Sequence, residues 1–319
     1  MNAILRQAAR VCVRVGLVNN MPKNARVATE LQFRNLLRHA LPARPIAFSH
    51  VSLAALSASQ SDGCTAADAG LDALIVTGTE PKCSRLEDES YWREFAALCA
   101  WLARENVPAI FSCLAAHAAV LYFDGVRRTP LEQKCWGNFP HRVQISDEYT
   151  SGLEDEYMVA HSRWNTVSAD ALARAGYRVL TASDEVGVDL FVKPDRPWVF
   201  CQGHPEYDSN ALAREYRRDV RRHLAGERED WPPLPQSVFT SREIAALEAL
   251  RLHATARRDP ESMDFPFAVE APNASESWLP PAAPVFGAWL ERIVTRKAQL
   301  AGLAMPMPTS GRKSHAVSG

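Results

Sequence analysis

The stretch "PAIFSCLAAH" (residues 108–117) joins a short apolar run to a run of small residues that favours a helix. The apolar run predicts a buried strand, and the residues after Cys113 predict the helix that follows it. Cys113 would then lie at the turn between the two. Most cysteines in a reduced protein are small core residues, whereas one at such a turn can serve as a nucleophile. The stretch alone leaves both interpretations open.

On both sides of this turn, short apolar runs alternate with amphipathic segments, which is typical of βα units around a largely parallel sheet. Further strands are predicted at residues 11–18, 46–53, 71–78, 157–161, 177–183, 187–193 and 197–203. Further helices are predicted at residues 28–41, 89–105, 209–226, 241–258 and 285–300. The pattern therefore predicts an α/β fold with helices on both faces of the sheet.

The composition changes after residue 230, where a proline-rich connector, "WPPLPQ" (231–236), begins. We expect residues 1–230 to form the main domain and residues 231–303 to form a C-terminal extension that packs on it. The last segment, 304–319, is polar and is predicted to be disordered. The apolar stripe of the last predicted helix suits an interface between two copies as well as the core, which leaves a homodimer open.

The overall composition gives no sign of a large charged partner. Among 319 residues there are 36 Lys and Arg against 37 Asp and Glu, a formal net charge of -1. No basic field therefore favours nucleic acid or an acidic membrane surface, and no apolar run reaches the length of a membrane span. The 7 cysteines are scattered, without the C-x-x-C pairs of zinc or redox sites. We expect a cytoplasmic protein with reduced thiols and no metal.

A second segment with catalytic potential is "VFCQGHPEYD" (199–208), in which a predicted strand ends just before His204. At period-two spacing, His204 and Glu206 can point the same way, so the carboxylate can orient the imidazole as a general base. The carboxyl ends of parallel strands meet at one edge of a sheet. Together with Cys113 the two residues would supply nucleophile, base and orienting group for acyl transfer. The backbone N–H of Leu114 could stabilise an oxyanion.

Cys113 at its strand-to-helix turn, with the later Gly-His-Pro-Glu run, resembles the class I glutamine amidotransferase-like fold. The chain more closely resembles the homoserine O-succinyltransferase/O-acetyltransferase family, which uses that fold. The matching stretches follow the family's order: "NNMPKNARVATELQF" (19–33), "DALIVTGTEP" (72–81), "ESYWREF" (89–95), "FSCLAAHAAV" (111–120), "VAHSRWN" (159–165), "GHPEYDSNALAREYRRDV" (203–220) and "WLPPAAPVFGAWLERIV" (278–294).

The resemblance implies a flavodoxin-like three-layer sandwich with a C-terminal helical extension. It also implies ping-pong transfer of an acyl group through a cysteine thioester to the hydroxyl of homoserine or a similar hydroxy amino acid, in methionine biosynthesis. The partners would be the amino acid and an acyl-CoA co-substrate, either succinyl-CoA or acetyl-CoA. No bound cofactor is implied.

Residue by residue, the resemblance places the nucleophile at Cys113, the base at His204 and the orienting carboxylate at Glu206. Contacts with the amino-acid substrate are implied for five residues: Lys134, Ser162, Arg163, Glu215 and Arg218. These residue types suit an α-amino acid. An arginine can hold its carboxylate bidentately, and a glutamate can accept hydrogen bonds from its ammonium group.

The implied oxyanion hole falls on the backbone at Leu114 and Met21. Leu114 stands where the family usually has an aromatic residue, a change that keeps the backbone N–H. The position that distinguishes acyl donors in the family falls on Lys82, where acetyl-CoA users resemble one another in having glutamate and succinyl-CoA users in having glycine. The lysine ammonium could pair with the far carboxylate of a succinyl group, or its bulk could exclude that group.

Two other kinds of function remain open. An amidase of the glutamine amidotransferase type would use the same cysteine and histidine, although "FSCLAA" (111–116) lacks the glycines that usually flank that cysteine. A non-catalytic binding module on the same fold would leave Cys113 unreactive. His117 lies four residues beyond Cys113 on the predicted helix, and we expect it to be packed rather than catalytic.

Overall fold

The computed structural model describes residues 12–53, 70–257, 265 and 280–300. Its centre is a seven-stranded sheet with the order β2-β1-β3-β4-β11-β10-β7. The five strands from β2 to β11 run parallel, β10 is antiparallel to β11, and β7 is antiparallel to β10. Their bounds are β1 (Val13–Val18), β2 (Ile46–His50), β3 (Ala73–Val76), β4 (Ala109–Ser112), β7 (Arg178–Val179), β10 (Leu190–Lys193) and β11 (Trp198–Cys201). The predicted α/β fold with a largely parallel sheet is confirmed.

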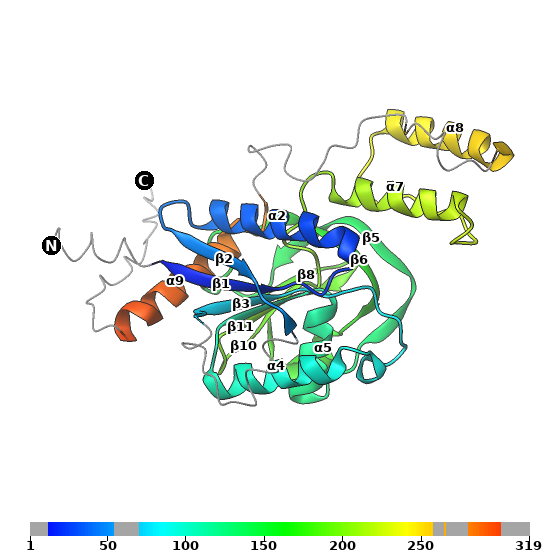
Figure 1. Cartoon of the computed structure of the whole chain (residues 1–319). Coiled ribbons are helices and arrows are strands. Elements are labelled where there is room, and N and C mark those ends of the chain that lie inside the picture. Colours follow the sequence, from blue (N-terminus) through cyan, green and yellow to red (C-terminus); the bar gives the residue numbers. More distant parts are fainter. Residues whose placement is uncertain (1–11, 54–69, 258–264, 266–279, 301–319) are drawn as a thin grey trace, which may run out of the picture.

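Helices cover both faces of this sheet (Figure 1). On one face lie α2 (Lys23–Ala40) and α9 (Ala283–Leu300), and on the other lie α4 (Trp92–Glu105) and α5 (Leu114–Asp124). The remaining helices are η1 (Leu86–Asp88), α6 (Ala169–Arg174), α7 (Ala211–Leu224) and α8 (Ser241–Arg257). Within the described ranges, no helix is long and apolar enough to cross a membrane.

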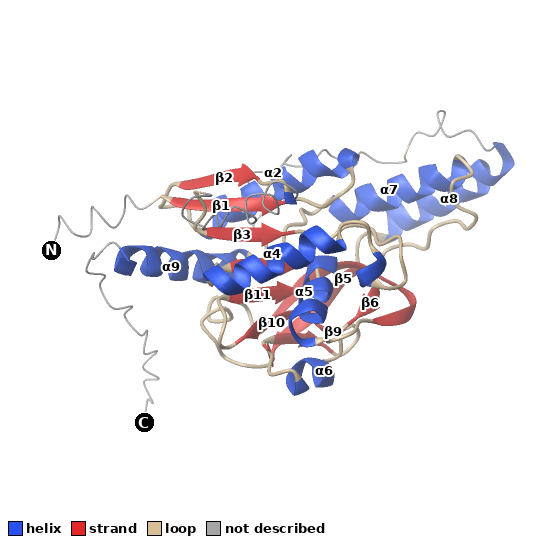
Figure 2. Ribbon diagram, turned by 60° about the horizontal axis from the view of Figure 1, so that its bottom comes forward, coloured by secondary structure: helices blue, strands red, loops and turns tan. Residues whose placement is uncertain are grey.

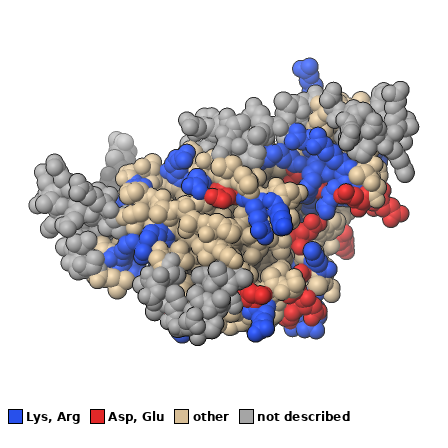
Figure 3. Space-filling model, viewed as in Figure 1, with Lys and Arg blue, Asp and Glu red and all other residues tan. Residues whose placement is uncertain are grey.

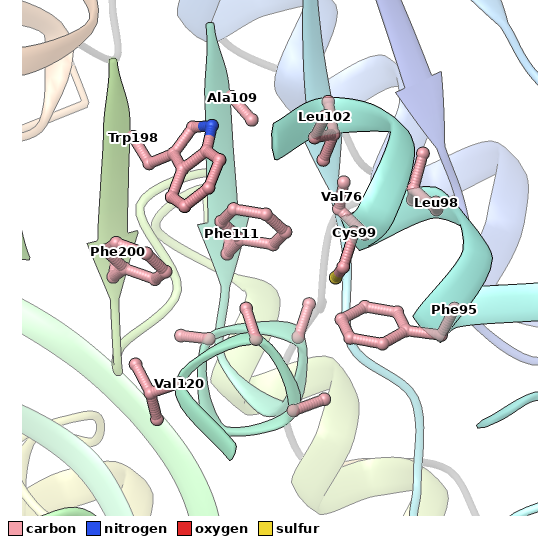
Figure 4. Close-up of a cluster of buried hydrophobic side chains, with 14 of the residues drawn as sticks. Val76, Phe95, Leu98, Cys99, Leu102, Ala109, Phe111, Val120, Trp198 and Phe200 are labelled. Atoms are coloured by element: carbon pink, nitrogen blue, oxygen red, sulfur yellow. The ribbon is translucent and has the colours of Figure 1, made fainter. Parts of the chain in front are cut away.

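The core has two halves, one on each face of the sheet, because neighbouring residues of a strand point to opposite faces. In β4, Ile110 packs with the side chains of α2 and α9, whereas Phe111 packs with those of α4 and α5. Figure 4 shows the second half, where the rings of Phe111 and Phe200 stack with centroids 5.2 Å apart. Burial on both faces explains why these strands read as continuous apolar runs.

A second, antiparallel sheet has the order β6-β5-β8-β9 (Figure 2). Its strands are β5 (Thr129–Val143), β6 (Glu156–Thr166), β8 (Thr181–Ser183) and β9 (Gly187–Val188). The sequence did not predict β5, whose first half is polar and largely exposed. Predicting single strands at 177–183 and 187–193 was wrong. Each divides between the two sheets, because the chain crosses from one to the other at Leu180 and Asp189.

The C-terminal segment contacts the rest of the chain in several places. Helix α9 packs against α2 and β1, and Gln236 pairs with Gly137 of β5. A Cβ atom at Gly137 would lie 2.4 Å from the Gln236 carbonyl oxygen, so only glycine permits this approach. Helix α8 runs alongside α7 (Figures 1 and 2). The domain limits stay a prediction, and the predicted tail, 304–319, lies outside the described residues.

Candidate active site

Cys113 occupies the turn between β4 and α5 in a backbone conformation that few residues adopt. Its φ of 54° and ψ of -117° lie outside the regions favoured by residues with a Cβ atom, which costs about 1–3 kcal/mol. The surrounding structure holds it there, since the Cys113 N–H donates to the Cys201 carbonyl of β11 at 2.8 Å. Leu114 begins α5, so its N–H has no acceptor within the helix and is available beside the thiol.

Gly78 brings the loop after β3 against this turn. A Cβ atom at Gly78 would lie 2.8 Å from the backbone nitrogen of Leu114 and 2.7 Å from its Cβ. Contacts this short with backbone atoms cannot be relieved by rotating a side chain. The absence of a side chain at Gly78 therefore permits the close packing of two adjacent strand ends around the Leu114 N–H.

Gly78→Ala is expected to displace the turn and lower kcat about 10²-fold, since a shift of about 1 Å in an active site can cost that much. Steady-state kinetics of purified protein would measure it. Gly152→Ala is the matched control, because its Cβ would crowd the Pro284 side chain at 2.9 Å instead of the turn. Equal kcat values for Gly78→Ala and the wild type would show that the close approach is not needed.

His204 and Glu206 follow β11 at the same edge of the sheet, next to β4. The His204 Nδ1 lies 3.0 Å from Glu206 Oε1, and both side chains are buried, with 9% and 5% exposure. The second carboxylate oxygen, Oε2, accepts a weaker hydrogen bond from the Ser112 hydroxyl at 3.4 Å. The backbone N–H of His204 donates to the Ala160 carbonyl of β6 at 2.8 Å. These contacts fix the imidazole with its other nitrogen free for the thiol.

The charges around His204 favour its protonated form. Burial by itself lowers the pKa of this imidazole, but the Cys113 thiolate and the Glu206 carboxylate outweigh burial and raise the pKa well above its usual value. Cys113 is also a hydrogen-bond partner of His204. A protonated imidazole beside the Cys113 sulfur is the arrangement that activates a cysteine nucleophile.

Tyr207 connects this pair to a partly buried carboxylate. Its ring stacks on the His204 imidazole with centroids 4.1 Å apart and planes tilted by 19°. Its hydroxyl donates a short hydrogen bond to Glu215 Oε1 on α7. The other oxygen, Glu215 Oε2, accepts from the Ser162 hydroxyl of β6 at 2.7 Å. One aromatic residue thus links the candidate base to Glu215.

Two cations lie near the Glu215 carboxylate. The Lys134 Nζ of β5 is 3.7 Å from Glu215 Oε2 and 3.8 Å from Asp219 Oδ2. The Arg218 Nε donates to Asp219 Oδ1 at 2.9 Å, and the Arg218 Nη2 forms an ion pair with the same oxygen at 2.8 Å. Burial raises the pKa of Glu215, but Lys134 and Arg218 outweigh burial and hold that pKa below its usual value. The cluster therefore presents an ionised carboxylate and two cations, the groups that an α-amino acid needs.

A model of the family described as homoserine O-succinyltransferase matches residues 2–300 of this chain. The chain belongs to the homoserine O-succinyltransferase family. It is 43% identical to a homoserine O-succinyltransferase of Methylorubrum extorquens, over 90% of this chain and 88% of that protein. With a homoserine O-succinyltransferase of Bradyrhizobium japonicum it shares 45% identity, over 77% of this chain and 79% of the relative.

This chain has the fold of the glutamine amidotransferases. A solved glutamine amidotransferase from Thermotoga maritima superposes with a TM-score of 0.52 at 12% identity, over 88% of this chain and 98% of that chain. A likeness at this identity shows the fold alone. It does not extend amidase activity to this member of the homoserine O-succinyltransferase family.

The resemblance to the homoserine O-succinyltransferase family implied a substrate contact for Arg163. This residue follows Ser162 in β6. The two side chains point to opposite faces of the strand. Ser162 contacts Glu215, whereas Arg163 is buried. The Arg163 guanidinium donates to three acceptors: His161 Nδ1 (3.3 Å), the Asn165 carbonyl (2.9 Å) and the Val186 carbonyl (2.5 Å). This placement suits a role in positioning β6, and substrate contact by Arg163 stays a prediction.

Lys82 and Met21 are two further predicted site residues. The hydrogen bonds described below do not connect either of them to the Glu215 cluster. The Lys82 backbone N–H donates to Glu89 Oε1 at 2.7 Å, and the Lys82 residue is exposed. The Met21 N–H donates to Asn19 Oδ1 at 3.2 Å, so it would have to exchange this acceptor to bind an oxyanion. The roles of Lys82 in donor choice and of Met21 in the oxyanion hole stay predictions.

Sequence reasoning assigned no role to Tyr207 or Gly78, although both lie within quoted motifs. An aromatic residue three positions after His204 was the available signal for Tyr207. His117 is packed, as predicted: it is buried, and its Nε2 lies 2.9 Å from Gln202 Oε1. Burial lowers the pKa of His117 to about 3, so this imidazole stays neutral near pH 7.

Proposed function

We propose that this protein transfers a succinyl group from succinyl-CoA to the hydroxyl of L-homoserine through a thioester on Cys113. One observation carries the proposal: the Cys113–His204–Glu206 group lies next to the Glu215 cluster, with Tyr207 in contact with both. This neighbourhood supports acyl transfer at the first group and binding of an amino acid at the second. Membership of the homoserine O-succinyltransferase family supports the choice of substrates.

In the first half-reaction, the Cys113 thiolate attacks the thioester carbonyl of succinyl-CoA. A carbon–sulfur bond forms, and the carbonyl oxygen becomes an oxyanion that the Leu114 N–H stabilises. When the tetrahedral intermediate collapses, the bond to the CoA sulfur breaks and His204 donates its proton to that sulfur. One thioester replaces another, so the step is nearly balanced in energy.

In the second half-reaction, His204 is neutral and acts as a base. It takes the proton of the homoserine hydroxyl as that oxygen attacks the Cys113 thioester. The Cys113 thiolate leaves, and the imidazolium is regenerated beside it. Glu206 keeps the required tautomer by accepting the Nδ1 hydrogen of His204, because only the other nitrogen can then exchange protons with substrate.

The Glu215 cluster would hold the amino-acid end of homoserine. A carboxylate has about four acceptor positions, so Glu215 can accept from the substrate ammonium besides Tyr207 and Ser162. Arg218 and Lys134 provide cations for the substrate carboxylate. Because burial lowers the pKa of Lys134 and its two carboxylate neighbours offset only part of that effect, the arrival of another carboxylate would be favourable.

Tyr207→Phe is expected to raise the KM for homoserine about tenfold, the loss of one hydrogen bond to a charged group, with a much smaller effect on acylation by succinyl-CoA. Phenylalanine keeps the ring on His204 and loses only the bond to Glu215. Tyr157→Phe is the matched control, since Tyr157 is another half-buried tyrosine whose hydroxyl bonds to a protein oxygen, Thr181 Oγ1 at 3.1 Å. An unchanged KM with slower acylation would contradict this role.

Steady-state assays with paired substrates test the proposed function. CoA release from succinyl-CoA should require homoserine for turnover, and double-reciprocal plots should give the parallel lines of a ping-pong reaction. Acetyl-CoA, serine and glutamine should be run beside them. If homoserine reacted with acetyl-CoA but not with succinyl-CoA, the donor would be reassigned. Ammonia release from glutamine without any CoA release would replace acyl transfer by amidase activity.

A further inference from the structure

Helix α7 presents a continuous row of arginines, of which Arg218 also belongs to the Glu215 cluster. Arg214, Arg217, Arg218, Arg221 and Arg222 recur at intervals of three and four residues, so they share one face of the helix. We call these five residues the arginine face. They line an open hollow of about 330 Å³, together with Glu227. Figure 3 shows Lys and Arg side chains gathered over α7.

The arginine face carries more positive charge than its neighbours neutralise. Arg214 pairs with Asp208 at 2.7 Å and Arg218 with Asp219 at 2.8 Å. Arg222 reaches Glu80 and Glu227 only at 3.8 and 3.7 Å. In the part of the chain that the structure describes, neither Arg217 nor Arg221 has an ion-pair partner. The pKa of Arg217 is lowered by burial and then by the cations Arg221 and Arg214, as expected where like charges face one another.

The arginine face begins at the candidate active site and leads away from it. Asp208, the partner of Arg214, directly follows Tyr207, and Glu215 lies on the same helical turn as Arg214. From Arg214 to Arg222 the helix rises about 12 Å, at 1.5 Å per residue. Glu80, which faces Arg222, belongs to the loop that carries Gly78 to the Cys113 turn. An extended ligand can therefore reach both the thiol and the arginines.

We propose that the arginine face, through Arg217 and Arg221, binds the phosphate groups at the nucleotide end of the acyl-CoA donor. This inference rests on the proposed function. The thioester of an acyl-CoA is joined by a long, uncharged pantetheine arm to a diphosphate and a 3′-phosphate, so its anionic end must lie away from the reacting carbonyl. Guanidinium groups match phosphate oxygens in bidentate geometry. The unneutralised charge of Arg217 and Arg221 is the feature that such phosphates would complement.

The test uses a double variant, Arg217→Gln with Arg221→Gln, which leaves Arg218 and the Glu215 cluster unchanged. Two succinyl donors are compared, succinyl-CoA and S-succinyl-pantetheine, which lacks all phosphates. The KM for succinyl-CoA is expected to rise about 30-fold, because two charge-assisted contacts are lost. The KM for S-succinyl-pantetheine and the KM for homoserine should change less than twofold. Unchanged use of S-succinyl-pantetheine thus verifies that the double variant is correctly folded.

Arg93→Gln with Arg104→Gln on α4 is the matched control, since it removes two cations from exposed sites on another helix; both KM values should stay at the wild-type level. Adenosine 3′,5′-bisphosphate, titrated calorimetrically against unreacted enzyme, should bind the wild type and bind the α7 double variant at least tenfold more weakly.

Equal KM values for succinyl-CoA in the wild type and the α7 double variant would overturn this inference and leave the proposed function intact. A parallel rise in KM for both donors would also overturn it, because S-succinyl-pantetheine has no phosphate to lose. Failure of the wild type to use either donor would overturn the proposed function and this inference with it.

Discussion

Cys113→Ala is expected to lower kcat for succinyl transfer by about 10⁴-fold or more, as removal of the nucleophile does in other enzymes with a catalytic triad. Among the thiols that the structure describes, only Cys113 lies on the β4–α5 turn beside the Leu114 N–H and His204. Alanine should not unfold the protein, since it is smaller and the thiol is only partly buried. Kinetics of purified protein would measure the loss, with circular dichroism to verify the fold.

Cys83→Ala is the matched control. Cys83 is another partly buried thiol, on the loop before α4, and its sulfur donates to the Asp88 carbonyl at 3.4 Å. This variant should keep wild-type kcat. Combining Cys113→Ala with His204→Ala should be little worse than either change alone, because the two side chains act as a unit. Multiplicative losses would show that they act independently, contrary to the proposed mechanism.

Glu206→Gln is expected to lower kcat/KM about 10³- to 10⁴-fold, the scale of losing the orienting carboxylate in a triad. Glutamine has nearly the same volume, but its amide nitrogen can face His204 Nδ1 and favour the wrong tautomer. The charge is lost as well. Glu206 helps to raise the pKa of His204, so removing this anion should lower that pKa. In the pH profile of kcat/KM for succinyl-CoA, the limb at high pH, where His204 loses its proton, should move to lower pH.

Ser112→Ala is the matched control for that variant. It removes only the 3.4 Å hydrogen bond to the second oxygen of Glu206 and leaves the carboxylate in place. Its effect on kcat/KM should be below about tenfold, because such a bond contributes only modestly. Similar losses in the two variants, or an unshifted pH profile in Glu206→Gln, would argue against orientation of His204 by Glu206.

The sequence was sufficient to predict where Cys113 and His204 would meet, because the information is local. Cys113 directly follows an apolar run that forms a parallel strand, His204 comes three residues after another, and the carboxyl ends of such strands share one edge of the sheet. The period-two spacing of His204 and Glu206 is likewise a property of a short segment. Both predictions depended on neighbouring residues alone.

The Glu215 cluster could not be assembled in this way. It depends on β5, whose polar first half gave no strand signal, and on which face of β6 each residue occupies. Ser162 and Arg163 are neighbours in the sequence, yet only Ser162 contacts Glu215. The contact between Tyr207 and Glu215 spans a loop and the first turn of α7. Such contacts are set by packing between elements, which the spacing of residues does not specify.

Intact-mass spectrometry after incubation with succinyl-CoA, without any acceptor, tests the central claim most directly. We expect the wild-type protein to gain one succinyl group per chain, to lose it when homoserine is added, and Cys113→Ala to gain none. Cys83→Ala should gain the same adduct as the wild type. An adduct that persists in Cys113→Ala, or a wild type that turns over homoserine without ever carrying an adduct, would contradict transfer through a Cys113 thioester.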